Sequence, residues 1–270
     1  MPRLDLDDGQ SIFYTDEGNG VAVVALHGWT CDGSDWSWLV ADLVADYRVI
    51  VPDLRAHGAS THRHGQRYTP RLFAADTLRL IESLGLRDVV IVGHSLGAIV
   101  ASVFAADHAD LVSALVLVDP QYGHDDAVLR PALEAVRADP HGFTTAAFGS
   151  FYSDVTPAWL RTWHLRRVLS TPAEVVAGTF AGLYDGDEGL GRRALSQGYL
   201  NRRNVPTLAV YATAALAAYE ESLPHGPYDE IAVWDGYGHF LHQEAPDRFA
   251  AAVRTWLDRL PATKYTAPAR

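Results

Sequence analysis

The chain has 270 residues and a formal net charge of −11 at neutral pH. This length suits one large domain, with or without an inserted segment, and the negative charge argues against nucleic acid or anionic membranes as partners. The single cysteine, Cys31, excludes an intrachain disulfide and a cysteine-rich metal cage. The polar N-terminus does not resemble a signal peptide, and no apolar run reaches the roughly 18 residues that span a bilayer. We therefore expect a cytoplasmic protein.

Short apolar runs alternate with longer amphipathic stretches along most of the chain. Two early runs, near 3–6 and 11–14, flank Asp8-Gly9 and predict an antiparallel hairpin. The later runs are continuously apolar, as expected for a mostly parallel sheet that helices cover on both faces. These later strands are expected at 21–26, 48–51, 88–92, 114–118, 207–211 and 230–234.

The stretches between the strands have apolar residues at helical spacing. They predict helices near 35–45, 70–84, 96–106 and 246–260. The pattern changes over 122–204, which holds no convincing strand but many aromatic residues, prolines and glycines. We therefore expect a core domain made of 1–121 and 205–262, a helical cap at 122–204 and a tail at 263–270.

The most informative motif is G-x-S-x-G, with Ser95 at its centre. An apolar run precedes Gly93, and a stretch rich in small residues follows Gly97. A nucleophilic serine needs a sharp turn between a strand and a helix, where side chains two positions before or after it would collide. The start of the helix also directs backbone N–H groups toward the reacting atoms. Ser95 is therefore the expected nucleophile.

These features resemble the α/β-hydrolase superfamily over almost the whole chain. The segment 26–29 is similar to the family's His-Gly loop, and 236–240 is similar to its histidine loop. The segment 53–60 is similar to the family's D-x-R-G-H-G-x-S motif, with Ala56 where glycine is usual. The resemblance implies an α/β fold with a mostly parallel eight-stranded sheet, flanking helices, and a helical cap after the sixth strand.

Of the twelve histidines, His239 is the best candidate for the general base. It follows an expected strand and comes after Ser95, in the order that the family uses; His242 is the alternative. The resemblance also implies that the backbone amides of Leu96 and Trp29 bind the oxyanion. It places the loop residues His27 and Gly28 beside the substrate.

The acid that orients the histidine is where the chain departs from the family pattern. Family members usually carry an aspartate after the seventh strand, but that position holds Ala215. Asp119, at the end of the sixth strand, is the best replacement, because several subfamilies place their acid there: haloalkane dehalogenases, zearalenone-type lactonases and cofactor-free dioxygenases of 3-hydroxy-4-quinolones. Glu220 and Glu221 are the alternatives.

Hydrolysis of a carboxylic ester or lactone is the leading functional prediction. Ser95 would form an acyl-enzyme, which water activated by His239 then cleaves. A dehalogenase is excluded because it needs a carboxylate where Ser95 stands. The alternative is a cofactor-independent dioxygenase of a 3-hydroxy-4-quinolone, in which a His–Asp pair deprotonates the substrate. Leu96 and the segment 240–246 are not typical of that subfamily.

Aromatic residues are expected to line an apolar pocket for a hydrophobic, aromatic or macrocyclic small molecule. They are Trp29, Tyr122, Trp159, Trp163 and Phe240. Trp159 and Trp163, four residues apart, would equally suit the core-facing stripe of one helix. We expect no metal and no organic cofactor, and either a monomer or a homodimer.

Overall fold

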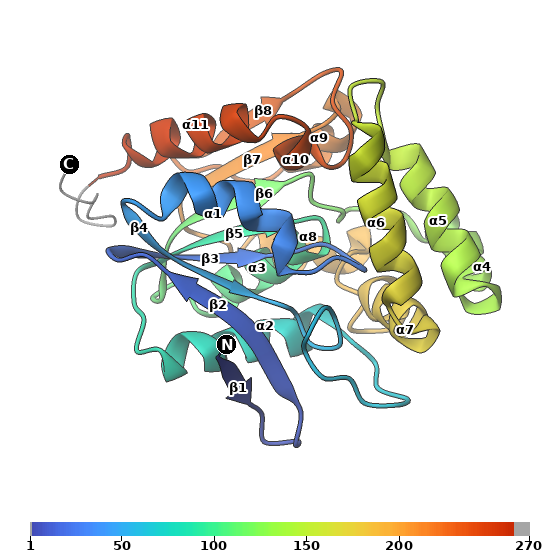
Figure 1. Cartoon of the computed structure of the whole chain (residues 1–270). Helices are drawn as coiled ribbons and strands as arrows, with labels where there is room; N and C mark the ends of the chain where they lie inside the picture. The colour runs from blue at the N-terminus through green and yellow to red at the C-terminus, as the bar shows by residue number, and fades with distance from the viewer. Residues whose placement is uncertain (1, 262–270) are drawn as a thin grey trace.

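The computed structural model describes residues 2–261; Met1 and residues 262–270, which include the expected tail, lie outside the described residues. A sheet of eight strands runs through the molecule in the order β1-β2-β4-β3-β5-β6-β7-β8 (Figure 1). The β1–β2 and β2–β4 pairs are antiparallel, and the other pairs are parallel. The strands are β1 (Arg3–Asp5), β2 (Ser11–Glu17), β3 (Val21–Leu26), β4 (Tyr47–Pro52), β5 (Val89–His94), β6 (Val112–Val118), β7 (Thr207–Tyr211) and β8 (Glu230–Val233).

The central strands are buried on both faces because a helical layer covers each face (Figure 1). Successive side chains of a strand point to opposite faces, so Val90 packs in the core beneath α1 and α11, whereas Ile91 packs in the core with α2 and α3. This explains why the sequence shows continuous apolar runs rather than alternation. The covering helices are α1 (Ser37–Leu43), α11 (Pro246–Leu257), α2 (Pro70–Ser83) and α3 (Leu96–Asp107).

Between β6 and β7 the chain forms five helices within residues 122–204, which we call the cap segment. Four of them, α4–α7, gather beyond the carboxyl ends of the parallel strands (right in Figure 1). The cap helices are α4 (Asp126–Ala138), α5 (Pro140–Phe151), α6 (Ala158–Ser170), α7 (Ala173–Tyr184) and α8 (Arg193–Leu200). The short remaining helices of the core are η1 (Gly33–Trp36), α9 (Ala214–Glu221) and α10 (Leu241–Glu244).

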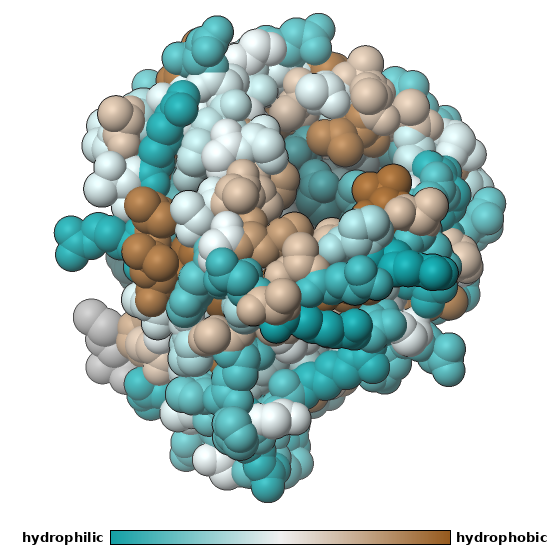
Figure 2. Space-filling model, turned by 90° about the vertical axis from the view of Figure 1, so that its right-hand side faces the viewer, coloured by the Kyte–Doolittle hydropathy of each residue, from teal (hydrophilic) through white to brown (hydrophobic). Residues whose placement is uncertain are grey.

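The cap segment also carries most of the large hydrophobic side chains that remain exposed. Seen from its side, the surface is mainly polar, with scattered hydrophobic groups that border a recess (Figure 2). The exposed hydrophobic residues of the cap segment are Val128, Val155, Trp159, Leu165 and Leu169. Within residues 2–261, no helix has the length and apolar character needed to cross a membrane.

Candidate active site

Ser95 lies at the turn between β5 and α3, in a backbone conformation that residues with side chains seldom adopt. Its φ is 53° and its ψ is −111°, and its N–H donates to the carbonyl oxygen of Val118 on β6 at 2.9 Å. A non-glycine residue at positive φ carries strain that the surrounding structure must offset. The turn therefore holds the serine in one fixed orientation at the carboxyl end of β5.

The two glycines of the motif are required by the close approach of three backbone segments. A Cβ on Gly93 would lie under 3.0 Å from the carbonyl oxygen of Gly97. A Cβ on Gly97 would in turn lie under 3.0 Å from the carbonyl oxygen of Leu26 on β3. These close approaches explain why the tight strand-to-helix turn requires glycine at both positions of the motif.

His239 is joined to Asp119 by a short hydrogen bond. The Nδ1 of His239, in the loop between β8 and α10, lies 2.6 Å from Oδ2 of Asp119. The other carboxylate oxygen of Asp119 accepts the N–H of Ala212 at 2.9 Å. Both side chains are buried. A carboxylate oxygen only accepts hydrogen bonds, so in this contact the imidazole is the donor: the proton of His239 lies on Nδ1, and Nε2 is the nitrogen left to accept.

The backbone of His239 is also held at both of its polar groups. Its N–H donates to the carbonyl oxygen of Phe151 at 2.8 Å, and its carbonyl oxygen accepts from Nε2 of His94 at 3.0 Å. Burial lowers the pKa of His94 well below its ordinary value, so His94 is a neutral donor. The His94 ring lies 4.5 Å from the His239 ring, centroid to centroid, which brings the loop of His239 against the residue that precedes Ser95.

Among residues 2–261, no hydrogen bond joins Ser95 Oγ to Nε2 of His239; the ring contacts His94 and Phe151. Hydrogen bonds between a nucleophile and its base are often long before substrate binds and shorten in the complex. The buried position of Ser95, 8% exposed, and of His239, 6% exposed, places both side chains away from bulk water.

Two backbone amides beside Ser95 have no acceptor in the described part of the chain. Leu96 is the first residue of α3, so its N–H has no partner within the helix. The N–H of Trp29 lies in the loop after β3 and also donates to no protein atom. This loop passes close over the serine: a Cβ on Gly28 would lie 3.5 Å from Cβ of Ser95. Beneath the loop, His27 is buried and accepts the N–H of Leu54 at 2.9 Å.

Aromatic side chains from the core and the cap segment surround these groups. Trp29 contacts Phe148 and Phe180, with ring centroids 6.4 and 5.0 Å apart, and its Nε1 donates to the carbonyl oxygen of Val176 on α7 at 3.1 Å. Phe148 also contacts Phe240, which follows His239. A cavity of about 200 Å³ lies between α5 and α6, with Phe148 on its wall; Ser95, Asp119 and His239 are not among the residues that line it. The sequence predicts Trp29 and Phe240 here but gives no signal for Phe148 or Phe180.

Tyr122 and the alternative acid Glu220 lie in a different buried cluster. Glu220 forms an ion pair with Arg203, and it accepts hydrogen bonds from the hydroxyls of Tyr122 and Tyr211. Its carboxylate is thus occupied by partners other than His239. Glu221, the second alternative, is exposed on α9. The structure therefore brings neither glutamate to His239, and Tyr122 contacts Glu220 and Tyr219 rather than the serine loop.

The predicted pocket residues Trp159 and Trp163 lie instead on the outer side of α6. Their rings contact Trp38 on α1 at centroid distances of 5.8 and 5.5 Å, and Trp159 is 52% exposed. The guanidinium of Arg167 lies over the Trp163 ring. The structure thus places these two tryptophans on the face of α6 that turns toward α1 and solvent.

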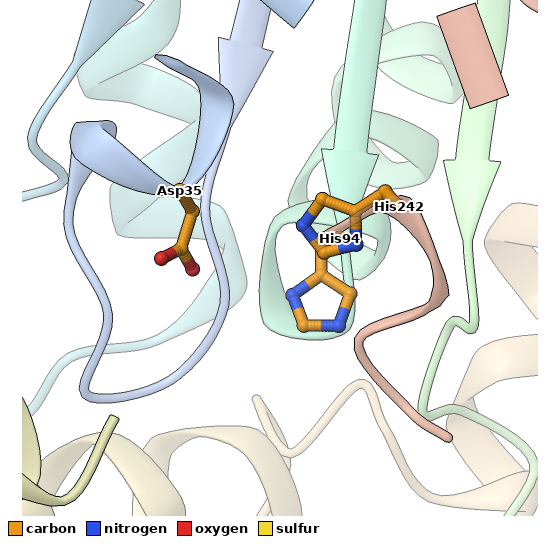
Figure 3. A group of neighbouring side chains, drawn as sticks. All are labelled: Asp35, His94 and His242. Carbon is orange, nitrogen blue, oxygen red and sulfur yellow. The ribbon is translucent and has the colours of Figure 1, made fainter. Parts of the chain in front are cut away.

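A second group of titratable side chains is buried near the serine turn. Asp35, His94 and His242 come from η1, β5 and α10, and their ligand atoms all lie within 4.8 Å of one another. The carboxylate of Asp35 faces the two imidazole rings (Figure 3). Neither ring nitrogen of His242 has a hydrogen-bond partner in the described part of the chain. These three side chains are the candidates for holding a metal ion.

The charge of this cluster fits a metal ion poorly. Burial acts to raise the pKa of Asp35, but Arg167 of α6, which pairs with this carboxylate, together with His164, His242 and a hydrogen bond from Cys31, outweighs burial and lowers the pKa to about 2. Burial lowers the pKa of His242 to about 3, so this ring is neutral. The guanidinium of Arg167 already pairs with both Asp35 and Asp32, and Asp35 is the one carboxylate among the three side chains, so a dication there would add positive charge that the cluster does not offset. We assign the cluster no metal.

A family model described as "alpha/beta hydrolase fold" matches residues 21–171. The chain belongs to this family. The α/β-hydrolase fold predicted from the motifs is therefore confirmed, including its eight-stranded, mostly parallel sheet. The match contains Ser95 and Asp119, whereas His239 lies beyond it.

Individual members of the α/β-hydrolase family match this chain to different extents. A non-heme haloperoxidase from Rhodococcus erythropolis is 35% identical over 156 residues, which cover 56% of this chain and 53% of the relative; the match thus spans about half of that protein. A solved thermophilic esterase from Thermogutta terrifontis is 25% identical, with a TM-score of 0.80, covering 96% of this chain and 99% of the other. An enol-lactonase from Burkholderia xenovorans shares the fold at 20% identity, with a TM-score of 0.78 and coverage of 96% and 100%.

Proposed function

We propose that this α/β-hydrolase cleaves a carboxylic ester or lactone, with Ser95 as nucleophile, His239 as general base and Asp119 as the acid that orients the base. The observation that carries the proposal is the 2.6 Å contact between Asp119 Oδ2 and His239 Nδ1, beside a serine at positive φ. With its proton on Nδ1, the imidazole has the tautomer that accepts a proton from a serine hydroxyl.

The proposed reaction proceeds by acyl transfer. Ser95 Oγ attacks the carbonyl carbon while its proton passes to His239 Nε2, and the new oxyanion accepts hydrogen bonds from the amides of Leu96 and Trp29, which have no other acceptor among the described residues. The imidazolium, stabilised by Asp119, donates its proton to the leaving alcohol. Water then cleaves the acyl-enzyme by the same proton transfers.

The surroundings of Ser95 support a hydrophobic small molecule as substrate. Trp29, Phe148 and Phe240 offer ring surface, and Ser95 itself is largely shielded from water. Apolar walls with a few convergent polar groups are typical of small-molecule sites. The occurrence of an esterase and an enol-lactonase among chains of the same fold is consistent with either an open-chain ester or a lactone.

The pair formed by Asp119 and His239 would also serve a cofactor-independent dioxygenase, which is the second candidate. In that reaction the imidazole removes the hydroxyl proton of a 3-hydroxy-4-quinolone, and the resulting anion reacts with oxygen. The two candidates differ in Ser95: acyl transfer needs its oxygen as nucleophile, whereas deprotonation needs only the imidazole.

The experiment is an activity panel on wild-type protein and Ser95→Ala. We expect hydrolysis of p-nitrophenyl esters or aromatic lactones by the wild type, loss of that hydrolysis in Ser95→Ala, and no oxygen uptake with a 3-hydroxy-4-quinolone. A fluorophosphonate should add one phosphonyl group to wild-type protein, as measured by mass spectrometry, and none to Ser95→Ala. Oxygen uptake that survives Ser95→Ala, without ester hydrolysis, would favour the dioxygenase; folded protein that is neither labelled nor active would overturn the hydrolase proposal.

A further inference from the structure

The carboxylate of Glu244, at the end of α10, bridges two segments that are distant in sequence. Its Oε2 accepts the N–H of Gly238 at 2.5 Å, and its Oε1 accepts the hydroxyl of Thr156 in the cap segment. Gly238 directly precedes His239. One half-buried side chain therefore connects the loop that carries the base to the cap segment.

The cap residues around Thr156 are fitted closely to the same loop. The Thr156 Oγ1 accepts the N–H of Ser153 at 2.9 Å, and the carbonyl oxygen of Phe151 accepts the N–H of His239. A Cβ on Gly238 would lie under 3.0 Å from that carbonyl oxygen. The two consecutive amides, those of Gly238 and His239, are thus both bound, one by Glu244 and one by the cap segment.

We propose that Glu244 is a positioning residue for the base: through the amide of Gly238 it holds the His239 imidazole between Asp119 and Ser95, and through Thr156 it makes this placement depend on the docked cap segment. The inference rests on the proposed function in taking His239 as the base. The peptide between Gly238 and His239 sets the direction of the imidazole, and a base displaced by about 1 Å can lose about 100-fold in rate.

Glu244 is held by hydrogen bonds from a backbone N–H and a hydroxyl and takes no part in an ion pair among the described residues. Among residues 2–261 it pairs with no lysine, arginine or histidine; its partners are an N–H and a hydroxyl. It therefore acts through fixed hydrogen bonds, for which an amide of the same shape can substitute. In Glu244→Gln the amide oxygen can accept from Gly238, and the NH₂ group can donate to Thr156.

The test compares Glu244→Ala, Glu244→Gln and Thr156→Val by steady-state kinetics on the ester found active with wild-type protein. We expect kcat to fall about 10- to 100-fold in Glu244→Ala with little change in KM, to fall less in Thr156→Val, and to stay within about threefold of wild type in Glu244→Gln. Glu221→Ala, an exposed glutamate on α9, is the matched control and should be unchanged.

A second readout separates positioning from stability and does not need activity. The Nδ1 proton in the hydrogen bond from His239 to Asp119 should give a downfield proton resonance, retained in Glu244→Gln and Ser95→Ala but lost or broadened in folded Glu244→Ala. Glu244→Ala that melts earlier yet keeps this resonance and its kcat would overturn the proposal. If wild-type protein hydrolyses no ester, the proposed function fails, while the resonance still decides whether Glu244 positions the imidazole.

Discussion

The carboxylate of Asp119 and the imidazole of His239 are 120 positions apart in sequence and 2.6 Å apart in the structure. The other oxygen of Asp119 accepts the N–H of Ala212, at the end of β7. Both oxygens of one carboxylate therefore act as acceptors, one for the base and one for the backbone of the neighbouring strand. Ala215 stands where the family usually has its acid, and the proposed function assigns that role to Asp119.

Asp119→Asn should lower kcat by about 10⁴-fold, because the amide cannot satisfy both partners. The N–H of Ala212 needs an acceptor, so the amide oxygen of Asn turns toward it and the NH₂ group faces Nδ1. The imidazole then carries its proton on Nε2 and cannot accept one from Ser95. Ester hydrolysis measures the effect, with Glu221→Gln as control; a loss under tenfold would mean that another group orients the base.

Gly97→Ala should destabilise the protein by about 1–3 kcal/mol or more, since the added Cβ meets the carbonyl oxygen of Leu26 and neither backbone can move freely. Gly198→Ala in α8 is the matched control, because nothing lies within 4 Å of its added Cβ. The control should gain about 0.5–1 kcal/mol from lower chain entropy in the unfolded state. Urea unfolding followed by tryptophan fluorescence gives both values, and equal stabilities would contradict the crowded turn.

Arg167→Met should cost about 3–5 kcal/mol of unfolding free energy, because it leaves the carboxylate of Asp35 buried without its cation. The double variant Asp35→Asn with Arg167→Met should recover a large part of that loss, since neither charge then remains unpaired. A double-mutant cycle in urea isolates the coupling. Additive effects of the two substitutions would show that the pair is not the source of the loss.

Acid should destabilise the folded chain below neutral pH. Burial lowers the pKa of His164 to about 4, and of His57 and His242 to about 3, from the ordinary value of 6.5. Below pH 6.5 these rings bind protons only when the chain unfolds, so stability present above pH 6.5 is lost as the pH falls toward 3. Each ring contributes about 1.4 kcal/mol per pH unit.

His242→Phe isolates one of these rings. Neither nitrogen of His242 has a hydrogen-bond partner among the described residues, so the substitution removes a titrating group without breaking such a bond. Between pH 5 and 6, unfolding free energy measured in urea should fall about 1.4 kcal/mol less per pH unit in the variant than in the wild type. Superimposable slopes would show that His242 is already protonated in the folded chain.

The strands, the serine turn and the loop of the base are predictable from sequence because short-range rules determine them. Gly93 and Gly97 are needed within a few residues of Ser95, and the apolar runs directly report burial on both faces of the sheet. Asp119 is predicted as the acid for two reasons: Ala215 replaces the usual aspartate, and Asp119 stands at the end of a strand. The contact with His239 is consistent with that choice.

The cap segment is less predictable because its helices are placed by tertiary packing. Trp159 and Trp163 share one face of α6, but the sequence does not determine whether that face turns toward the serine or toward Trp38. Phe148 and Phe180 reach Trp29 for the same reason without any local signal. Glu244 and Thr156 are 88 positions apart, so no spacing rule relates them.

Asp119 directly follows β6, and its carboxylate accepts the N–H of Ala212, which directly follows β7; these two strands are neighbours in the sheet. The chain leaves the sheet just after β6 and returns at β7, so the whole cap segment lies between the two strands that hold Asp119. The cap segment can therefore differ between related proteins while β6, β7 and the carboxylate of Asp119 keep their places. The position of His239, by contrast, depends on the cap segment, because the carbonyl oxygen of Phe151 accepts its N–H. A cap segment taken from another protein would have to supply a backbone carbonyl oxygen that accepts the N–H of His239.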